Sequence, residues 1–212
     1  GSAPCFPSGI IHINTGHTLK HNRVLFRGYP EEETIKQDID RIRHHTMVTY
    51  DGMVSLANQV RFCELNAVEG DYVETGCWGG GALGLMALSN LKWGQKRRKI
   101  HGFDSFQGLP EPGKNDEQDV FQMVPKHREV KSGDWKGRLN PVGLVAGVSS
   151  EIVEILLFDI IQYPREFLTL YEGWFQHTVP QAAANTLEKI AILRLDGDLY
   201  ESTWVCLEHL FP

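Results

Sequence analysis

Two carboxylates stand one residue apart directly after a mostly aliphatic run, an arrangement that could bind a metal ion or move protons. The run 190–195 is followed by Asp196, a glycine and Asp198. Carboxylates at the carboxyl end of a strand lie where open α/β sheets place their ligands. Their oxygens suit Mg²⁺, which takes one or two protein carboxylates together with water and substrate oxygens. We predict Asp196 as the metal ligand, whereas Asp198 could be a second ligand or the N-cap of the next helix.

A glycine-rich turn follows the short predicted strand 72–75 and could hold a cofactor at the start of a helix. Gly79, Gly81 and Gly84 formally satisfy G-x-G-x-x-G, and Asp104 follows at about the right distance to hold a ribose. This match favours a nicotinamide-dependent oxidoreductase. In dinucleotide-binding proteins, however, the pattern begins directly after the strand, and here it begins several residues later.

The first residues after the same predicted strand favour a different cofactor. Trp78 stands where a second glycine would admit a pyrophosphate, and Glu74 suits a ligand with an amino group. S-adenosylmethionine carries an ammonium group, a carboxylate and a ribose but no phosphate, and the amides of a helix N-terminus can bind its carboxylate. A third interpretation is that the glycines only allow a helix to pack closely on a strand.

Two further groups of side chains follow predicted strands and fit the same cofactor. Asp104 ends the run 99–104, where a carboxylate can accept both hydroxyls of a ribose. The alternative for Asp104 is an N-cap of the following turn. Trp174 and Phe175 follow Gly173, and their rings could enclose an adenine or simply cover the core.

The elements that must position these residues alternate between strands and helices. Strands are predicted at 72–75, 99–104, 167–171 and 189–195, and helices at 31–44, from Asp51 onward, at 82–91, at 151–161 with Ser149 or Ser150 as its cap, in part of 179–187, and at 202–210. This alternation predicts a doubly wound, mostly parallel, Rossmann-like α/β sheet. Residues 1–30 read as an irregular N-terminal arm, residues 31–212 as the cofactor-binding domain, and 111–148 as a lid or substrate loop, because long polar connections are often functional.

Composition excludes several classes of function. The chain has 212 residues, of which 42% are hydrophobic, and a net charge of -6 without a long basic run, so nucleic acid is not expected as a partner. No apolar run approaches the roughly 18 residues that cross a membrane. The four cysteines form no CxxC pair, which suits a cytoplasmic protein, and Cys63 and Cys206 are expected in the core. Apart from His17 and His21 in the irregular arm, the nine histidines lack metal-ligand spacing, and G-x-S-x-G is absent.

Five stretches, taken together and in order, resemble the macrocin O-methyltransferase family, whose members act on sugars of macrolide and aminocoumarin antibiotics. The stretches are His45-Thr46-Met47 with the helix to Cys63; 70–76 with Trp78 and 80–82; Phe103-Asp104-Ser105-Phe106-Gln107-Gly108-Leu109-Pro110; Gly173-Trp174-Phe175 with Thr178 and Pro180; and 193–203. They cover most of residues 44–212. The family usually has Trp-Arg-Gly-Gly where this chain has Trp78-Gly79-Gly80-Gly81, and 111–148 matches poorly.

The resemblance implies a class I methyltransferase that uses S-adenosylmethionine and magnesium to methylate a hydroxyl of a sugar or glycosylated small molecule. The residues implied to line the cofactor are Thr46, Met47, Glu74, Thr75, Gly76, Cys77, Trp78, Asp104, Ser105, Phe106, Gln107, Gly108, Trp174 and Phe175, with Ser149 near the adenine. Asp196 is implied as the first metal ligand, which with the cation would orient and acidify the acceptor.

Two features of the family fall outside this sequence, and they keep other functions open. The remaining family ligands are adjacent aspartates at the end of the next strand, so the sheet is expected to lack its C-terminal strands. A cofactor-binding scaffold without catalysis is therefore one alternative, and the nicotinamide-dependent oxidoreductase is the other. The resemblance leaves homo-oligomer formation open.

Overall fold

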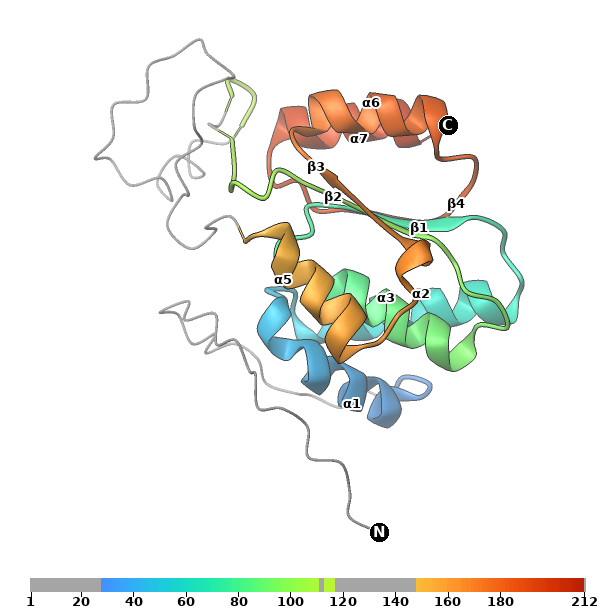
Figure 1. Ribbon diagram of the computed structural model, residues 1–212. Helices are drawn as coiled ribbons and strands as arrows, with labels where there is room; N and C mark the ends of the chain where they lie inside the picture. Colours follow the sequence, from blue (N-terminus) through green and yellow to red (C-terminus); the bar gives the residue numbers. More distant parts are fainter. Residues whose placement is uncertain (1–27, 111–112, 117–147, 212) are drawn as a thin grey trace.

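A four-stranded parallel sheet forms the centre of the protein in the computed structural model, which describes residues 28–110, 113–116 and 148–211 (Figure 1). The strands are β1 (Asp71–Thr75), β2 (Ile100–Asp104), β3 (Leu168–Glu172) and β4 (Ile190–Leu195). They lie in the order β3-β2-β1-β4, and every neighbouring pair is parallel. The predicted doubly wound α/β fold is confirmed, with each predicted strand within one or two residues of its observed bounds.

The strand order creates a switch point between β1 and β4. The chain steps outward from β1 to β2 and β3, then returns to place β4 on the other side of β1. In open α/β sheets the crevice beside such a reversal, outside the carboxyl ends of the strands, is where ligands bind. The residues that follow β1 and β4 therefore meet at this crevice.

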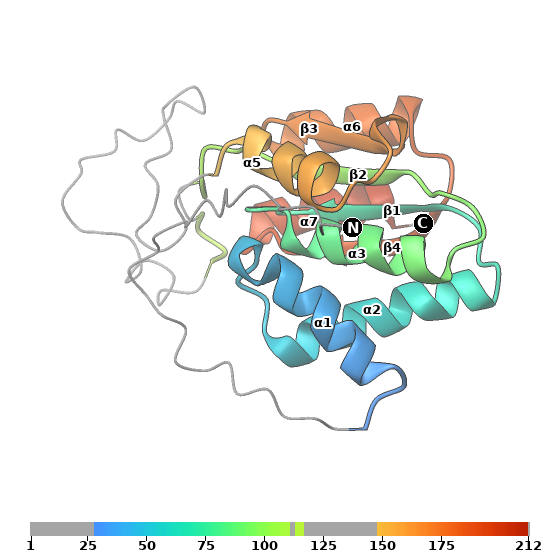
Figure 2. The same ribbon diagram turned by 60° about the horizontal axis from the view of Figure 1, so that its bottom comes forward.

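Helices cover both faces of the sheet, as Figures 1 and 2 show. One face carries α1 (Glu32–Ile42), α2 (Tyr50–Leu65), α3 (Gly81–Trp93) and α5 (Ser150–Glu154), which continues as a π-helix over Ile155–Ile160. The other face carries α6 (Phe175–Asn185) and α7 (Tyr200–Leu210), and short 3-10 turns lie at Arg43–His45 and Arg165–Phe167. Because both faces are covered, β1 and β2 are almost entirely buried, as apolar runs in parallel sheets usually are.

The core divides into two hydrophobic clusters, one on each side of the sheet. The larger cluster joins α1, α2, α3 and α5 and includes Met53 and Leu83, both fully buried. The smaller cluster joins the sheet to α6 and α7 through Phe103, Val179 and Cys206. The expectation that Cys63 and Cys206 are core residues is confirmed, since both thiols are buried.

Some helix starts differ from the prediction. The N-cap of α2 is Thr49, whose hydroxyl accepts the amide of Gly52 at 3.3 Å, whereas Asp51 lies in the first turn, where its charge favours the helix dipole. Helix α6 begins at Phe175, four residues before the predicted start, and contains Pro180. Ser149, one of the two predicted caps of α5, accepts the amide of Glu151 at 3.3 Å.

Two predicted segments lie mostly outside the described residues. Of the N-terminal arm only 28–30 is described, and of the predicted lid or substrate loop only 113–116 and Val148 are described. Within the described ranges, every helix is too short or too polar to cross a membrane.

Candidate functional site

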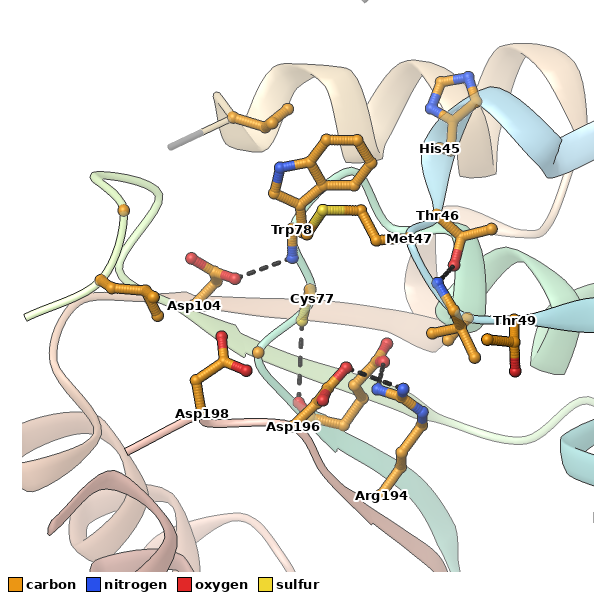
Figure 3. Close-up of a pocket in the computed structure, with 17 residues that line it drawn as sticks. His45, Thr46, Met47, Thr49, Cys77, Trp78, Asp104, Arg194, Asp196 and Asp198 are labelled. Atoms are coloured by element: carbon orange, nitrogen blue, oxygen red, sulfur yellow. Dashed lines mark hydrogen bonds and ion pairs between the residues drawn. The ribbon is translucent and has the colours of Figure 1, made fainter. Parts of the chain in front are cut away.

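A cavity of about 410 Å³ opens at the switch point, at the carboxyl ends of β1, β2 and β4 (Figure 3). Five segments build it: the stretch 45–49 before α2, the turn after β1 with the start of α3, the turn after β2, Val148 before α5, and the end of β4. The lining residues are His45, Thr46, Met47, Val48, Thr49, Glu74, Gly76, Cys77, Trp78, Ala82, Asp104, Gly108, Leu109, Val148, Arg194, Asp196 and Asp198. Segments far apart in the sequence thus meet where the fold predicts a ligand.

The structure brings most of the predicted site residues to this cavity. Nine of them line it: Thr46, Met47, Glu74, Gly76, Cys77, Trp78, Asp104, Gly108 and Asp196. Ser105, Trp174 and Phe175 line a smaller cavity of about 50 Å³, which shares Asp104 and Asp196 with the first and so adjoins it. Thr75, Phe106, Gln107 and Ser149 line neither cavity.

The residues outside the main cavity have identifiable structural roles. Thr75 is 1% exposed in β1 and contacts Cys206 of α7. Phe106 packs against the larger core cluster, and Ser149 caps α5 beside Val148, which does line the cavity. Phe175 is buried in the smaller core cluster, so its ring covers the core as the alternative interpretation proposed.

The three glycines of the G-x-G-x-x-G pattern meet protein atoms. A Cβ at Gly81 would lie 2.5 Å from Thr46 Cβ, and one at Gly79 would lie 3.0 Å from the carbonyl oxygen of His45. At Gly84 it would lie 2.9 Å from Cδ1 of Ile161, the residue that follows the π-helix. The absent side chains therefore make room for the 45–46 stretch and for helix packing, which removes the main support for a dinucleotide site.

Gly76 is required by its conformation and by a close approach between strand ends. It has φ 87°, a value that favours glycine, and a Cβ there would lie 2.0 Å from the carbonyl oxygen of Asp196. The amide of Asp196 in turn donates to the carbonyl of Thr75 at 2.8 Å. Gly76 therefore lets the ends of β1 and β4 meet at the floor of the cavity.

Asp104 organises the turns around the cavity. Its Oδ2 accepts the amide of Trp78 at 2.9 Å, and its Oδ1 accepts the amide of Phe106 at 2.8 Å. Burial raises the pKa of Asp104 despite these amide hydrogen bonds, which act in the opposite direction. Each carboxylate oxygen accepts more than one hydrogen bond, so the carboxylate that fixes the turns retains capacity for a ligand.

Arg194 is the main cavity residue that sequence reasoning missed. Its Nη1 donates to Glu74 Oε1 at 2.6 Å, and its Nη2 pairs with Asp196 Oδ2 at 2.8 Å. The register of β1 and β4 sets Glu74 opposite Arg194. Alternation along β4 puts Asp196, two residues on, on the same side as Arg194. The available signal in the sequence was that Arg194 is the single charged residue of the aliphatic run 190–195 and lies two residues before the predicted ligand Asp196.

Glu74 is a buried carboxyl group with one oxygen unused. The side chain lines the cavity yet is only 1% exposed, and among the described residues Oε2 has no hydrogen-bond partner. Burial raises the pKa of Glu74 to about 8, against the opposing influence of Arg194. An unpaired buried oxygen is costly, so Glu74 is suited to a ligand that supplies the missing partner.

Of the two roles considered for Asp198, second metal ligand or N-cap of the last helix, the structure does not show the N-cap. The N-cap of α7 is Leu199, without a side-chain cap, and the amide of Tyr200 donates instead to Asp116 Oδ1 at 2.7 Å. Asp198 has φ 59° and lines the cavity. Burial raises the pKa of its carboxyl group most, and the negative charges of Asp196 and Asp104 raise it further. The left-handed backbone at Asp198 directs the carboxylate into the cavity rather than along the helix (Figure 3).

Asp196 and Asp198 place two carboxylates at this end of the cavity. The Asp196 side chain is 45% exposed, and one of its oxygens is free of Arg194. Within the described residues, no group of three or more His, Cys, Asp or Glu side chains comes together as a metal site. The donor set therefore fits a cation that takes its other ligands from water and substrate, as Mg²⁺ does.

Comparison with known proteins identifies relatives. The sequence model of macrocin-O-methyltransferase (TylF) matches residues 13–212. Demethyldecarbamoylnovobiocin O-methyltransferase of Streptomyces niveus is 36% identical over 170 residues, 79% of this chain and 57% of that protein. An 8-demethyl-8-(2,3-dimethoxy-alpha-L-rhamnosyl)-tetracenomycin-C 4'-O-methyltransferase of Streptomyces olivaceus is 33% identical over 170 residues, 79% of this chain and 58% of that protein.

A solved structure shares the fold. The O-methyltransferase NovP aligns with a TM-score of 0.62 and 34% sequence identity, over 79% of this chain and 62% of that one. The chain spans about three fifths of the length of these relatives.

Proposed function

The chain belongs to the macrocin-O-methyltransferase (TylF) family, and we propose that it is an S-adenosylmethionine-dependent O-methyltransferase. The proposed acceptor is a hydroxyl of a sugar or of a glycosylated small molecule, and the name of one relative specifies a rhamnosyl-tetracenomycin acceptor. The observation that carries this proposal is the cavity at the switch point of β1 and β4, where Glu74, Asp104 and Asp196 converge.

The chemistry of the cavity suits this cofactor better than a phosphate-containing one. Glu74 offers its unpartnered Oε2 to the amino group of the cofactor. Asp104, at the end of β2, accepts the ribose hydroxyls, and Trp78 and Met47 provide apolar surface beside it. The cavity lacks the open glycine surface that a pyrophosphate needs, because Gly79 and Gly81 pack against His45 and Thr46.

The transfer itself is a displacement at carbon. When bound, S-adenosylmethionine supplies a methyl group on a sulfonium sulfur, which leaves as a neutral thioether. Glu74 and Asp104 would hold this cofactor, which would supply its methyl group to the acceptor oxygen while the sulfur keeps the electron pair of the broken C–S bond. The hydroxyl proton passes to the carboxylate of Asp198, to which none of the described residues donates a hydrogen bond. Holding the oxygen, carbon and sulfur in line accounts for much of the acceleration in such reactions.

Magnesium is the metal proposed for this site, with Asp196 as a ligand. The Asp196 side chain, directly after β4, is 45% exposed, and Asp198 adds negative charge beside it. A bound divalent cation lowers the pKa of a coordinated hydroxyl and fixes its oxygen. In this arrangement Asp196 orients the acceptor, and the acidic ends of β2 and β4 balance the charge of the ion.

Cofactor binding and turnover test the proposal separately. Calorimetric titration with S-adenosylhomocysteine should give saturable binding, and titration with NADH should give none. Incubation with labelled S-adenosylmethionine and Mg²⁺ should label demethyldecarbamoylnovobiocin or the rhamnosyl-tetracenomycin acceptor, and a chelator should abolish the transfer. The absence of any heat with S-adenosylhomocysteine would refute the proposal. Cofactor binding without transfer to any glycoside would favour the catalytically inactive scaffold.

A further inference from the structure

Arg194 connects the two ends of the cavity through a continuous chain of three side chains. Its Nη1 lies 2.6 Å from Glu74 Oε1 and its Nη2 lies 2.8 Å from Asp196 Oδ2. The sheet fixes this geometry, because Glu74 and Arg194 are register partners in β1 and β4. The guanidinium therefore uses both arms of its fork, one for each carboxylate.

The two carboxylates differ in what they lose without the guanidinium. The Glu74 side chain is 1% exposed and its other oxygen already lacks a partner, so losing Arg194 leaves a buried carboxyl with no hydrogen bond from the described residues. The Asp196 side chain is 45% exposed and can be solvated by water. Arg194 is thus structurally important to Glu74, whereas for Asp196 it mainly restricts the orientation of an exposed carboxylate.

From this asymmetry we infer that Arg194 is a positioning residue for methyl transfer, which holds the Asp196 carboxylate in register with the cofactor end of the cavity. The inference rests on the proposed function, since it assigns Asp196 to the acceptor and Glu74 to the cofactor. Arg194 acts through the two carboxylates that it joins. It ties the acceptor-side carboxylate to β1, so that the two ends of the site move as one unit.

Replacing Arg194 by lysine separates positioning from stability. Lysine keeps the charge but has one ammonium group, so it cannot form the two-armed bridge. The ammonium should stay with buried Glu74, because leaving that group unpaired costs more than leaving the exposed Asp196 to water. Arg194→Lys should therefore leave the unfolding midpoint unchanged and keep the dissociation constant for S-adenosylhomocysteine within about threefold of the parent value. Its kcat should fall about 10- to 100-fold, the loss expected from a misplaced reacting group.

A matched control comes from Arg97, at the opposite end of the sheet. It also uses both arms of its fork, donating to the carbonyls of Asn90 at 2.9 Å and Gly94 at 2.8 Å. Arg97→Lys should leave kcat and cofactor affinity unchanged. A fall in kcat of equal size in both variants would show that any lost arginine fork impairs the enzyme and would overturn the inference.

The bridge is also tested without any ligand. Urea unfolding of Arg194→Met, Asp196→Asn and the double variant should give non-additive effects, since neighbours that share an interaction couple. Strict additivity would overturn the bridge even if the protein is an active methyltransferase. An unchanged kcat in Arg194→Lys, or an equal loss in cofactor affinity, would overturn the positioning role. Failure of the parent protein to bind S-adenosylhomocysteine would instead refute the proposed function, while the unfolding cycle would still decide whether the bridge exists.

Discussion

Glu74→Gln should change how the stability of the protein depends on pH. The carboxyl group has an ordinary pKa of 4.5 in the unfolded chain, and burial raises its pKa to about 8 in the folded protein. Between these two values the folded state holds a proton that the unfolded state has released. The free energy of unfolding therefore decreases as pH rises through this window. Glutamine has a similar shape and does not ionise, so the variant lacks this contribution.

The size of the effect follows from the width of the window. A shift from 4.5 to about 8, at about 1.4 kcal/mol per unit, corresponds to about 5 kcal/mol. Domains of this size are stable by roughly 5–15 kcal/mol, so the loss is a large fraction of the whole. The pKa of about 8 is the net result of burial and the opposing attraction of Arg194, whose Nη1 lies 2.6 Å from Glu74 Oε1.

The assay is urea unfolding of the parent and of Glu74→Gln at a series of values from about pH 5 to about pH 9, with the difference in unfolding free energy plotted against pH. Taking the difference between parent and variant cancels the contribution of other titrating groups. One of these is His101, whose lowered pKa makes the unfolding free energy increase with pH below about pH 6.5. Glu172→Gln, which removes an exposed carboxylate at the end of β3, is the control. If the unfolding free energies of the parent and Glu74→Gln follow parallel curves against pH, the argument that burial outweighs the Arg194 pair is refuted. If the parent instead gains stability relative to the variant at high pH, the Arg194 pair outweighs burial.

Three further substitutions test other parts of the site. Asp116→Ala should lower the unfolding free energy by about 1 kcal/mol, because Asp116 accepts the amide of Tyr200 at the start of α7; Asp116→Asn should retain most of that stability, and equal values for both would contradict the capping role. Gly81→Ala should cost roughly 1–3 kcal/mol, since the added Cβ would lie 2.5 Å from Thr46 Cβ. Its control is Gly113→Ala, whose nearest contact is 3.6 Å, and similar unfolding midpoints for both would exclude the clash. Asp104→Asn should weaken S-adenosylhomocysteine binding about tenfold or more in calorimetry, because the amide loses the charged hydrogen bonds, and an unchanged dissociation constant would remove Asp104 from the cofactor site.

The positions of the strands could be predicted because each strand has a local sequence signal. The strand β4 is mostly aliphatic, whereas β1 and β2 are short segments of mixed polarity, Asp71–Thr75 and Ile100–Asp104. Their ends carry acids, so the position of the site at the carboxyl edge followed from the topology of open sheets. What local sequence could not supply was the order of the strands, which decides that β1 and β4, rather than β1 and β3, share the crevice.

The roles of individual glycines were less predictable, because the sequence shows spacing but not what lies opposite. Gly79, Gly81 and Gly84 fit a nucleotide pattern by spacing, yet each faces protein atoms from a segment distant in the sequence. Gly76 is the glycine that the site requires, since its φ of 87° and its approach to Asp196 exclude a side chain. A glycine pattern is therefore evidence for a close approach, and only the tertiary structure identifies the partner.

Asp198 and Arg194 show why the acidic end of the site was misjudged from sequence. Asp before a helix is most often a cap, so the short spacing between Asp196 and Asp198 favoured separate roles. The cap is supplied instead by Asp116, more than eighty positions away, which leaves Asp198 facing the cavity. Arg194 was hidden by its position inside an aliphatic strand, and its function depends on register with Glu74. Both errors have one cause: the charge of a side chain is local, whereas its partner is set by the sheet, so the chemistry of such a site follows from pairing between strands rather than from spacing along one of them.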